Sequence, residues 1–459
     1  MRERTLRKRK TGEIAAIIVT AVLFVLLLVL TVLFLLAQRE RSSSGDDFSL
    51  GEITADRTVD ATEISRCLLP ETMCVTLGDE RLGLVGAENI MRELYALVSP
   101  AVSEAFASGA AREGTEEEWR GFAEMKNSVF IRYHGELPDA VIGLFADLER
   151  GVSAPAREET GYVSELFLIP YVNGANVAEA AVRDREGHVL LYSVTMPTEI
   201  LRAEDLSKFI GSFRSSFAAF SFRVVGGALQ PVFSAPIVTR GVIMTQNNAV
   251  FVRDNQAELN RFLRVFGMNP DKLLSTRTEE DGELTSVGTH GALTVGETTF
   301  SYQSTSEGGI GLKDLIGYQD NVGIAGYIRA CLSLCADVRA LNRSYIGGDA
   351  ELTLWSFRSE AGKVSLSFVY TFDNIRISDV PRALEVTFEK GLLTSARVYT
   401  VTVGVSRVSR VQVPAEEWFF RWLSARGGER TDRVSLVYRA DFLSDNVRAE
   451  WGARRAADG

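Results

Sequence analysis

Hydrophobic positions are distributed unevenly along the chain, and the longest apolar run lies near its start. Between Ile14 and Ala37 the sequence contains no charged residue, no Pro and no Gly. A helix over these 24 residues would be about 36 Å long, more than the roughly 30 Å hydrocarbon core of a bilayer. The apolar region of a cleavable signal peptide has only about 7–15 residues, and this run ends in LLAQRER rather than in a convincing small-x-small cleavage site. The pattern therefore predicts an uncleaved transmembrane helix over residues 14–37.

The charges that flank this run predict its orientation. Basic residues are concentrated before it, in the tail over residues 1–13, whereas only Arg39 and Arg41 follow it closely. By the positive-inside rule, the tail is cytoplasmic and residues 38–459 are extracytoplasmic. Residues 38–50 are polar and rich in Ser, which is typical of a short juxtamembrane linker. No second apolar run of this length occurs, so the sequence predicts a single-pass protein of the cell membrane, in contact with the lipid bilayer.

Beyond the linker, apolar positions recur with helical and strand periods in turn. Residues 51–229 predict, in order, a strand at 73–77, a helix over 86–108, a strand over 128–138, an extended run at 165–172, two strands within 177–195 and a helix over 204–217. We interpret this region as an N-terminal α+β domain.

The remaining sequence divides into two further units by the same criteria. Residues 230–316 predict a strand at 248–254, a helix with Leu259, Phe262 and Leu263 on one face and Gly267 as its end, and a Gly-punctuated β-meander over 278–312. Residues 317–459 predict a helix over 321–341, four strands, a short aromatic helix over 415–423 and a final strand pair. Helices segregated from antiparallel strands predict an α+β fold, with flanking helices on antiparallel sheets.

Composition and charge limit the classes of protein. The outer part is too long for one hydrophobic core, so two or three domains are expected. The formal net charge of the chain is −10, and the basic residues of the outer part are scattered along it. This distribution predicts no binding of nucleic acid.

The four cysteines form two pairs in the sequence. Cys67 and Cys74 flank a short loop, LLPETM, and an extracytoplasmic location would permit a disulfide between them; two unlinked thiols are the alternative. Cys331 and Cys335 are four positions apart in a predicted helix, so they share a face and are expected to be small buried residues. Neither pair has a His nearby, and the sequence therefore predicts no zinc site.

Motifs of enzymatic chemistry are absent from the sequence. It contains no Gly-x-Ser-x-Gly, no Ser-x-x-Lys, no His-Glu-x-x-His and no Gly-Lys-Ser/Thr phosphate loop. Its histidines, His134, His188 and His290, lie far apart, and we predict that His134 is a half-exposed turn residue rather than a ligand or a base. The Gly-rich stretch GGIGLKD over 308–314 is interpreted as a strand-to-helix turn. The sequence therefore predicts no catalytic residue, no metal and no cofactor, and favours a protein that is not an enzyme.

One arrangement of segments is more specific than any single motif. VFIRYHGELP is followed by RFLRVFGMNP, by GELTSVGTHGALTVGETTFSYQSTSEGGIGL and by YRADFLSDNVRAEWGA, all after a basic tail and one apolar run. This order resembles the YycH family of bacterial regulatory proteins, with a C-terminal part similar to the related YycI. The family's Gly-Ile-x-Leu step matches Gly309 to Leu312, and its Tyr strand and Pro-x-Trp match Tyr438 and Trp451. Ala449 stands where the family pattern has Pro, so the last unit fits less well than the middle one.

The resemblance implies a regulator of a two-component system rather than an enzyme. Members of the family associate with the sensor histidine kinase that controls the cell wall (WalK, also called YycG) and with YycI, through contacts that include transmembrane helices. The expected function is therefore an accessory regulator of such a kinase. An anchored envelope-binding or assembly module, or an anchored cell-wall enzyme, is the alternative.

The apolar run itself offers a candidate contact surface. Thr20 and Thr31 are eleven positions apart, about three helical turns, and so lie nearly on one face with Ala16 and Leu27. Because helix association in lipid depends on close packing and polar contacts, we predict that this stripe faces the kinase. The alternative is a lipid-facing anchor whose Thr hydroxyls bond to their own helix.

Overall fold

The structure is a computed structural model of the 459-residue chain. It describes residues 64, 66–108, 110–149, 161–170, 177–195, 201–225, 228–245, 249–280, 282–305, 308–316, 323–380, 382–407, 410–425, 433–442 and 447–454. The predicted transmembrane helix over 14–37, its stripe of four contact residues and the linker over 38–50 lie outside this part of the chain. Within it, no helix has the length and apolar character needed to cross a membrane. Residues 50–459 form one compact unit.

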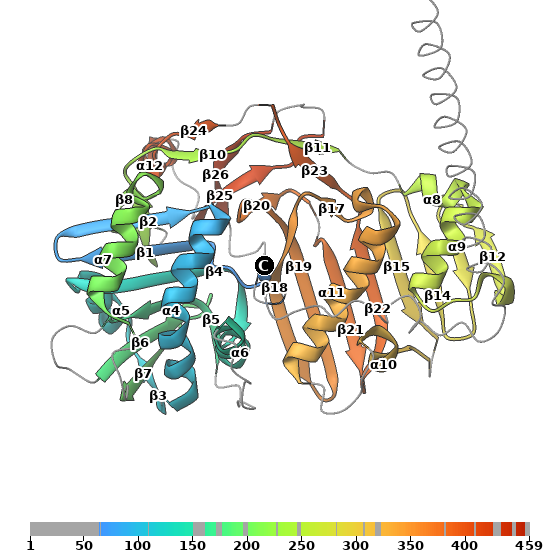
Figure 1. Cartoon of the computed structure of the whole chain (residues 1–459), viewed down its shortest axis with the longest axis horizontal. Coiled ribbons are helices and arrows are strands. Elements are labelled where there is room, and N and C mark those ends of the chain that lie inside the picture. The colour runs from blue at the N-terminus through green and yellow to red at the C-terminus, as the bar shows by residue number, and fades with distance from the viewer. Residues whose placement is uncertain are drawn as a thin grey trace, which may run out of the picture. The chain divides into compact units, whose positions relative to one another are not determined.

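The N-terminal half is built on an antiparallel sheet (Figure 1). Its strands run in the spatial order β9-β8-β2-β1-β4-β5-β6-β7-β3. Their bounds are β1 (Thr72–Leu77), β2 (Glu80–Val85), β3 (Ala110–Gly114), β4 (Asn127–Pro138), β5 (Tyr162–Leu168), β6 (Val177–Arg183), β7 (Val189–Thr195), β8 (Ala218–Val225) and β9 (Ala228–Phe233). The helices of this half are α4 (Glu88–Ser108), α5 (Glu116–Glu124), α6 (Asp139–Glu149) and α7 (Ala203–Ser212), with a 3₁₀ turn over Arg214–Ser216.

A second antiparallel sheet forms the C-terminal half, in the order β12-β13-β14-β15-β22-β21-β19-β18. The bounds are β12 (Ser275–Thr278), β13 (Leu284–Val287), β14 (Gly291–Val295), β15 (Thr299–Ser304), β18 (Glu351–Glu360), β19 (Lys363–Phe372), β21 (Leu384–Glu389) and β22 (Leu392–Tyr399). β16 (Ile310–Gly311) pairs with β22, and β20 (Ile375–Ser378) joins β19 to the hairpin of β25 (Arg433–Arg439) and β26 (Ala449–Arg454). Two small sheets complete it, β10 (Ile237–Thr239) with β24 (Val411–Val413), and β11 (Val242–Thr245) with β23 (Thr402–Val405) and β17 (Gly347–Gly348).

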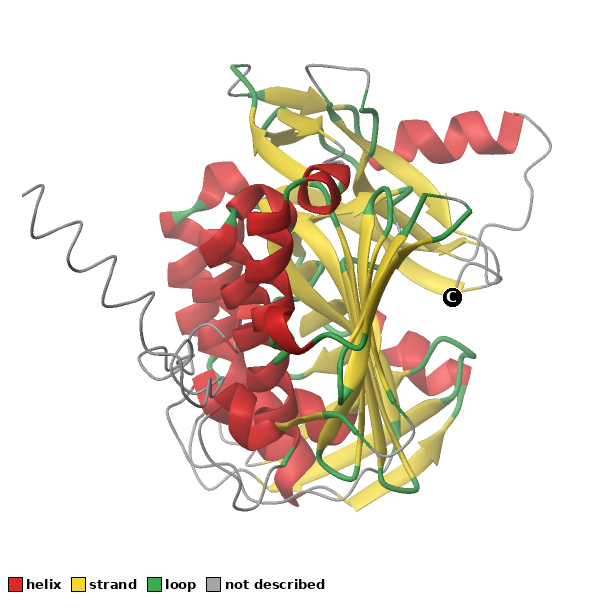
Figure 2. Ribbon diagram, turned by 90° about the vertical axis from the view of Figure 1, so that its right-hand side faces the viewer, coloured by secondary structure: helices red, strands yellow, loops and turns green. Residues whose placement is uncertain are grey.

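Helices α8 (Val250–Asp254), α9 (Gln256–Val265), α10 (Leu312–Ile316) and α11 (Ile324–Leu341) belong to the second half, with 3₁₀ turns at Pro270–Lys272 and Arg343–Tyr345. Helix α12 (Glu416–Ala425) contacts β9 of the first half. Figure 1 shows α4, α7 and α11 in front of the strands, and Figure 2 shows a layer of helices stacked against one face of the sheets, with further helices on the opposite side. The predicted α+β class with antiparallel sheets and flanking helices is therefore confirmed.

Elements with a strong local period lie where the sequence predicts them. The helix with Leu259, Phe262 and Leu263 on one face is α9: Asn255 caps its first turn, all three apolar side chains are buried, and Gly267 follows its end with φ +66°. The predicted meander is the antiparallel run β12–β15. GGIGLKD leads from β16 into α10, as the interpretation of a strand-to-helix turn requires.

The predicted strand at 248–254 is wrong, because Val250–Asp254 form the helix α8. The alternation of apolar residues around Phe251 suggested a strand, but Val252 is buried and Phe251 is 59% exposed. The Ala249 amide donates to the carbonyl of Glu297 at 2.7 Å, so a contact distant in sequence fixes the start of this helix.

Strands from different predicted domains pair with one another, so the sheets cross the predicted domain boundaries. Residue 230 lies inside β9, which forms a hairpin with β8. β15, from the predicted middle domain, pairs with β22, from the predicted C-terminal domain. The two large sheets also meet, where β4 and β18 pair in parallel at Glu136 and Ser356.

Buried ion pairs add to this connection. Arg132 on β4 and Arg183 on β6, the two strands that flank β5, both contact the carboxylate of Glu165 on β5. Arg433, on β25, contacts the carboxylate of Glu71, just before β1. Burial alone would raise the pKa values of both glutamates, but the arginines outweigh it and lower each pKa to about 2. Both carboxylates are therefore charged at neutral pH. The pair of Glu71 with Arg433 joins a segment near the start of the described chain to one near its end.

The prediction for His134 is wrong in its exposure. His134 lies within β4, is only 2% exposed, and its Nε2 is 3.2 Å from Oδ1 of Asn374. The amide of Asn374 donates in turn to the carbonyl of Pro70 at 2.6 Å. Burial lowers the pKa of His134 to about 4, so the ring is neutral at pH 7 and belongs to the packing between the two halves.

Candidate functional site

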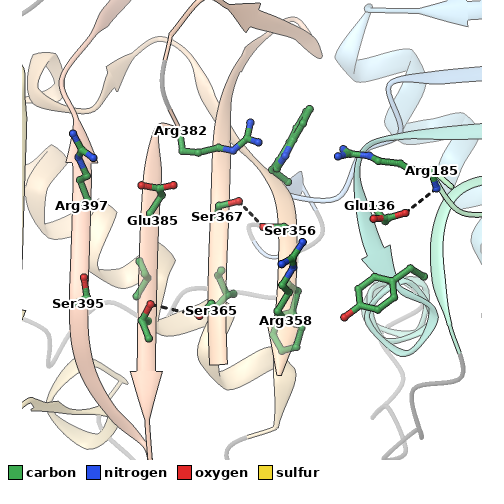
Figure 3. A pocket seen from close by; sticks show the side chains of 16 residues that line it. Glu136, Arg185, Ser356, Arg358, Ser365, Ser367, Arg382, Glu385, Ser395 and Arg397 are labelled. Carbon is green, nitrogen blue, oxygen red and sulfur yellow. Dashed lines mark hydrogen bonds between the residues drawn. The ribbon is translucent and has the colours of Figure 1, made fainter. Parts of the chain in front are cut away.

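An open cleft of about 490 Å³ lies where the two large sheets meet. Its floor is one face of β18, β19, β21 and β22, and residues of β4, the start of β5 and the β6–β7 turn form its other wall (Figure 3). Four arginines and two glutamates line it: Arg185, Arg358, Arg382, Arg397, Glu136 and Glu385. No His, Cys or Lys occurs among its described lining residues.

Strand register builds the floor of the cleft. Ser356, Ser367, Glu385 and Arg397 are successive cross-strand partners, and they form one row over the four strands. A second row, two positions further along each strand, consists of Arg358, Ser365, Thr387 and Ser395. Hydroxyls within the rows pair with each other, at 2.6 Å for Ser356 with Ser367 and 3.5 Å for Ser365 with Thr387. The result is a continuous polar face on an otherwise well-packed sheet (Figure 3).

Trp355 stands at the junction because β18 bulges there. The register of β18 against β19 shifts between Leu354 and Ser356, and Trp355 is the extra residue of this bulge. A bulge of this kind changes the direction of a side chain and bends the strand. The indole is only 3% exposed, and the guanidinium carbons of Arg185, Arg376 and Arg382 lie 5.0, 5.0 and 4.3 Å from its ring centroid.

A glycine on the opposite strand permits this approach. A Cβ atom on Gly135 would lie 1.8 Å from the carbonyl oxygen of Trp355 and 2.5 Å from its carbonyl carbon. Only a residue without a side chain fits between the two backbones, so Gly135 allows β4 and β18 to pair. The adjacent Glu136 accepts a hydrogen bond from the backbone amide of Arg185 at 2.8 Å, which fixes the β6–β7 turn at the rim.

The charged groups of the cleft have perturbed pKa values. Burial lowers the pKa of Arg382, and the nearby positive charges of Arg376 and Arg185 lower it further, to about 10. Burial likewise lowers the pKa values of Arg376 and Arg185 and raises that of Glu136. The arginines remain cationic at neutral pH. Guanidinium and hydroxyl groups donate hydrogen bonds to a ligand, and the carboxylates of Glu136 and Glu385 accept them.

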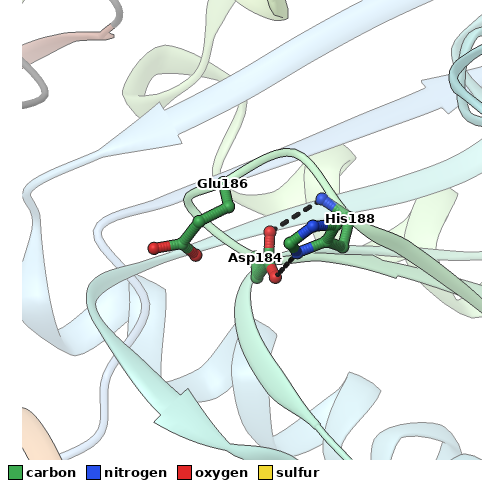
Figure 4. A group of neighbouring side chains, drawn as sticks. All are labelled: Asp184, Glu186 and His188. Atoms are coloured by element: carbon green, nitrogen blue, oxygen red, sulfur yellow. Dashed lines mark hydrogen bonds and ion pairs between the residues drawn. The ribbon is translucent and has the colours of Figure 1, made fainter.

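A second group of chemically active side chains lies in the turn between β6 and β7 (Figure 4). One ligand atom each of Asp184, Glu186 and His188 lies within 4.8 Å of the others, a spacing that could hold a metal ion. Both oxygens of Asp184 are already bonded within the turn, one to the His188 amide at 2.8 Å and the other to its Nδ1 at 2.7 Å. These contacts raise the pKa of His188 and explain the group as the closure of an exposed hairpin.

The remaining residues singled out from the sequence take no part in the cleft. Cys67 and Cys74 are separate buried thiols, so the structure has the unlinked alternative and not the disulfide. Cys74 lies within β1 and faces Gly83 of β2, which directs its sulfur into that hairpin. Cys331 and Cys335 are buried in α11, as predicted.

None of the residues that line the cleft was predicted as functional. The alternating polar positions of β19, β21 and β22 are visible in the sequence, but they are typical of any sheet with one solvated face. The position of Trp355 depends on a bulge and on pairing with a strand 220 positions earlier, from Glu136 to Ser356.

Comparisons with known proteins add no relative. No family model, no curated protein and no solved structure matches the chain. The resemblance to the YycH family therefore stays a prediction from the sequence.

Proposed function

We propose that this protein is a membrane-anchored, extracytoplasmic accessory regulator that modulates a sensor histidine kinase of a cell-wall-controlling two-component system, together with a YycI-like partner. The observation that carries the proposal is the apolar run over 14–37 with its basic flank, placed ahead of one compact unit over 50–459. A single helix in this position can connect an outer binding region to a kinase in the same membrane.

The cleft supports a role in binding rather than in turnover. Its described lining is dominated by guanidinium groups and hydroxyls, with two carboxylates and no His, Cys or Lys. In this proposal the outer unit binds, and the membrane helix transmits the bound state through contacts on the stripe of Ala16, Thr20, Leu27 and Thr31.

The test is co-purification of the kinase with the full-length chain from membranes. Replacing both Thr20 and Thr31 by Leu removes the only hydroxyls of the apolar run, and we expect the recovered kinase to fall. The matched control replaces Val22 and Val29 by Leu, because these positions lie about 180–200° around the helix from Thr20. Equal recovery from all three proteins would refute the stripe.

A second substitution tests the proposal as a whole. Exchanging residues 14–37 for an unrelated apolar helix of the same length keeps the anchor and the outer unit but removes every specific contact in the membrane. We expect loss of kinase association and of the kinase response, measured as phosphorylation of its response regulator. An exchanged protein that associates and regulates normally would contradict the proposed transmission through this helix.

A further inference from the structure

Three positive charges surround one buried indole at the rim of the cleft. The guanidinium carbons of Arg185, Arg376 and Arg382 each lie within 5.0 Å of the Trp355 ring centroid. They are therefore within about 10 Å of one another, close to the screening length of about 8 Å at physiological ionic strength. Each contact with the ring is favourable, but the three cations repel one another.

These three cations, of which Arg185 is exposed and Arg376 and Arg382 are partly buried, lack the close carboxylate partners that the chain provides to its most deeply buried arginines. Arg132, Arg183 and Arg433 all form ion pairs with buried glutamates. By contrast, no described acidic group lies within 4.0 Å of the three guanidinium groups around Trp355. The lowered pKa of Arg382 has burial as its main cause and the neighbouring arginines as its second.

The surroundings of this cluster provide more hydrogen-bond donors than balancing carboxylates, although Glu136 acts on Arg185, Glu71 on Arg376 and Glu385 on Arg382. Arg358 and Arg397 lie on the floor of the cleft, also without an ion pair among the described residues, against the two glutamates of the lining. Serine and threonine hydroxyls fill the positions between them. The open space is about 490 Å³, enough for a small ligand.

A purely structural role explains only part of this arrangement. One arginine stacked on Trp355 would cover the indole and join the β6–β7 turn to β18. Two more cations on the same ring add repulsion, which an anion in the open space beside them would remove. Guanidinium forks match the oxygens of phosphate and carboxylate in pairs, so several arginines around one cavity are the arrangement that such groups require.

We propose that the cleft is a binding site for a compact polyanion, a ligand that carries two or more phosphate or carboxylate groups within about 10 Å, with Arg185 and Arg382, which both line the cleft, as its main contacts. This inference goes beyond the proposed regulation of a kinase and does not depend on it.

The test is titration calorimetry of the full-length protein in a neutral detergent at low salt. Tripolyphosphate is the phosphate probe, citrate is the carboxylate probe and sucrose is the uncharged probe. We expect saturable binding of at least one polyanion, which weakens as NaCl is raised, and none of sucrose. Preference for tripolyphosphate would assign the site to phosphate ligands, and preference for citrate would assign it to carboxylates.

Single variants show where binding occurs. Arg382→Gln and Arg185→Gln are each expected to weaken binding by about tenfold or more, the effect of one hydrogen-bonded charge. The matched control is Arg410→Gln, which removes the same charge from an exposed position outside the cleft and is expected to bind as the unchanged protein does. Thermal unfolding confirms that each variant is folded.

Two results would overturn the inference. One is that neither polyanion binds the folded protein at low salt. The other is that Arg410→Gln weakens binding as much as the cleft variants do, since the attraction would then be a general effect of surface charge. Both are independent of kinase association, which is measured in a separate experiment.

Discussion

Substituting Gly135 by Ala tests the junction of the two sheets most directly. The added Cβ would lie 1.8 Å from the carbonyl oxygen of Trp355, 2.5 Å from the carbon and 2.7 Å from its Cα. All three are backbone atoms, so no side-chain rotation relieves the overlap. The strands β4 and β18 would have to separate by at least about 1.2 Å to restore a tolerable contact, and their pairing at Glu136 and Ser356 would be lost.

The expected cost is at the upper end of the range for overpacking, about 3 kcal/mol of unfolding free energy. We would measure it by urea denaturation of the full-length protein, with tryptophan fluorescence as the signal. Because Trp355 and Arg185 are held at this junction, we also expect Gly135→Ala to weaken any polyanion binding.

The matched control is Gly121→Ala, which makes the same chemical change in helix α5. No atom lies within 4 Å of a Cβ at Gly121, and the position is exposed. Alanine is favoured over glycine in a helix, so this variant is expected to gain about 0.5–1 kcal/mol. If Gly135→Ala unfolds at the same urea concentration as the unchanged protein, the close approach of β4 to β18 is refuted.

Three further substitutions test the charges. Arg433→Met leaves the buried carboxylate of Glu71 unpaired and is expected to cost about 3–5 kcal/mol at pH 7 in urea titrations; a cost below about 1 kcal/mol would contradict the pairing. The pKa of Glu71 is lowered to about 2, so the stability that its charged carboxylate contributes is complete above the ordinary pKa of 4.5 and is lost as pH falls towards 2. Wild type and Arg433→Met should therefore converge in unfolding free energy between pH 4.5 and pH 2. Burial raises the pKa of Glu416 to about 8, so the free energy of unfolding falls as pH rises from 4.5 to 8. Glu416→Gln should remove this pH dependence and be the more stable protein at pH 8. Thermal unfolding at pH 4.5 and pH 8 measures the difference. Arg382→Gln should unfold at the same or a higher temperature than wild type without ligand, because it removes one of three repelling cations; a lower unfolding temperature would indicate a structural role for that charge.

Much of the fold follows from local patterns. Helices α9 and α11 each have an apolar face, α9 also has a clear N-cap, and the β12–β15 meander is marked by glycines at its turns. In these segments local preference and tertiary packing favour the same structure, so sequence periodicity is sufficient. The two errors lie where they differ: a distant carbonyl fixes α8, and a second sheet buries His134 inside a strand.

The cleft could not have been predicted, because its defining property is a local charge imbalance that no segment of the sequence contains. Arg185 lies on a turn of the first half, Arg376 on β20 and Arg382 just before β21, each among residues of mixed charge. They become neighbours only after Gly135 lets two strands from distant parts of the chain pair and a bulge turns Trp355 between them. The net charge of −10 argues against an anion-binding site, since it suggests a protein that repels anions. A polyanion site in this chain therefore depends on the geometry of one junction, and Gly135→Ala and Arg382→Gln separate the two requirements: the first removes the junction, and the second removes charge while leaving the junction in place.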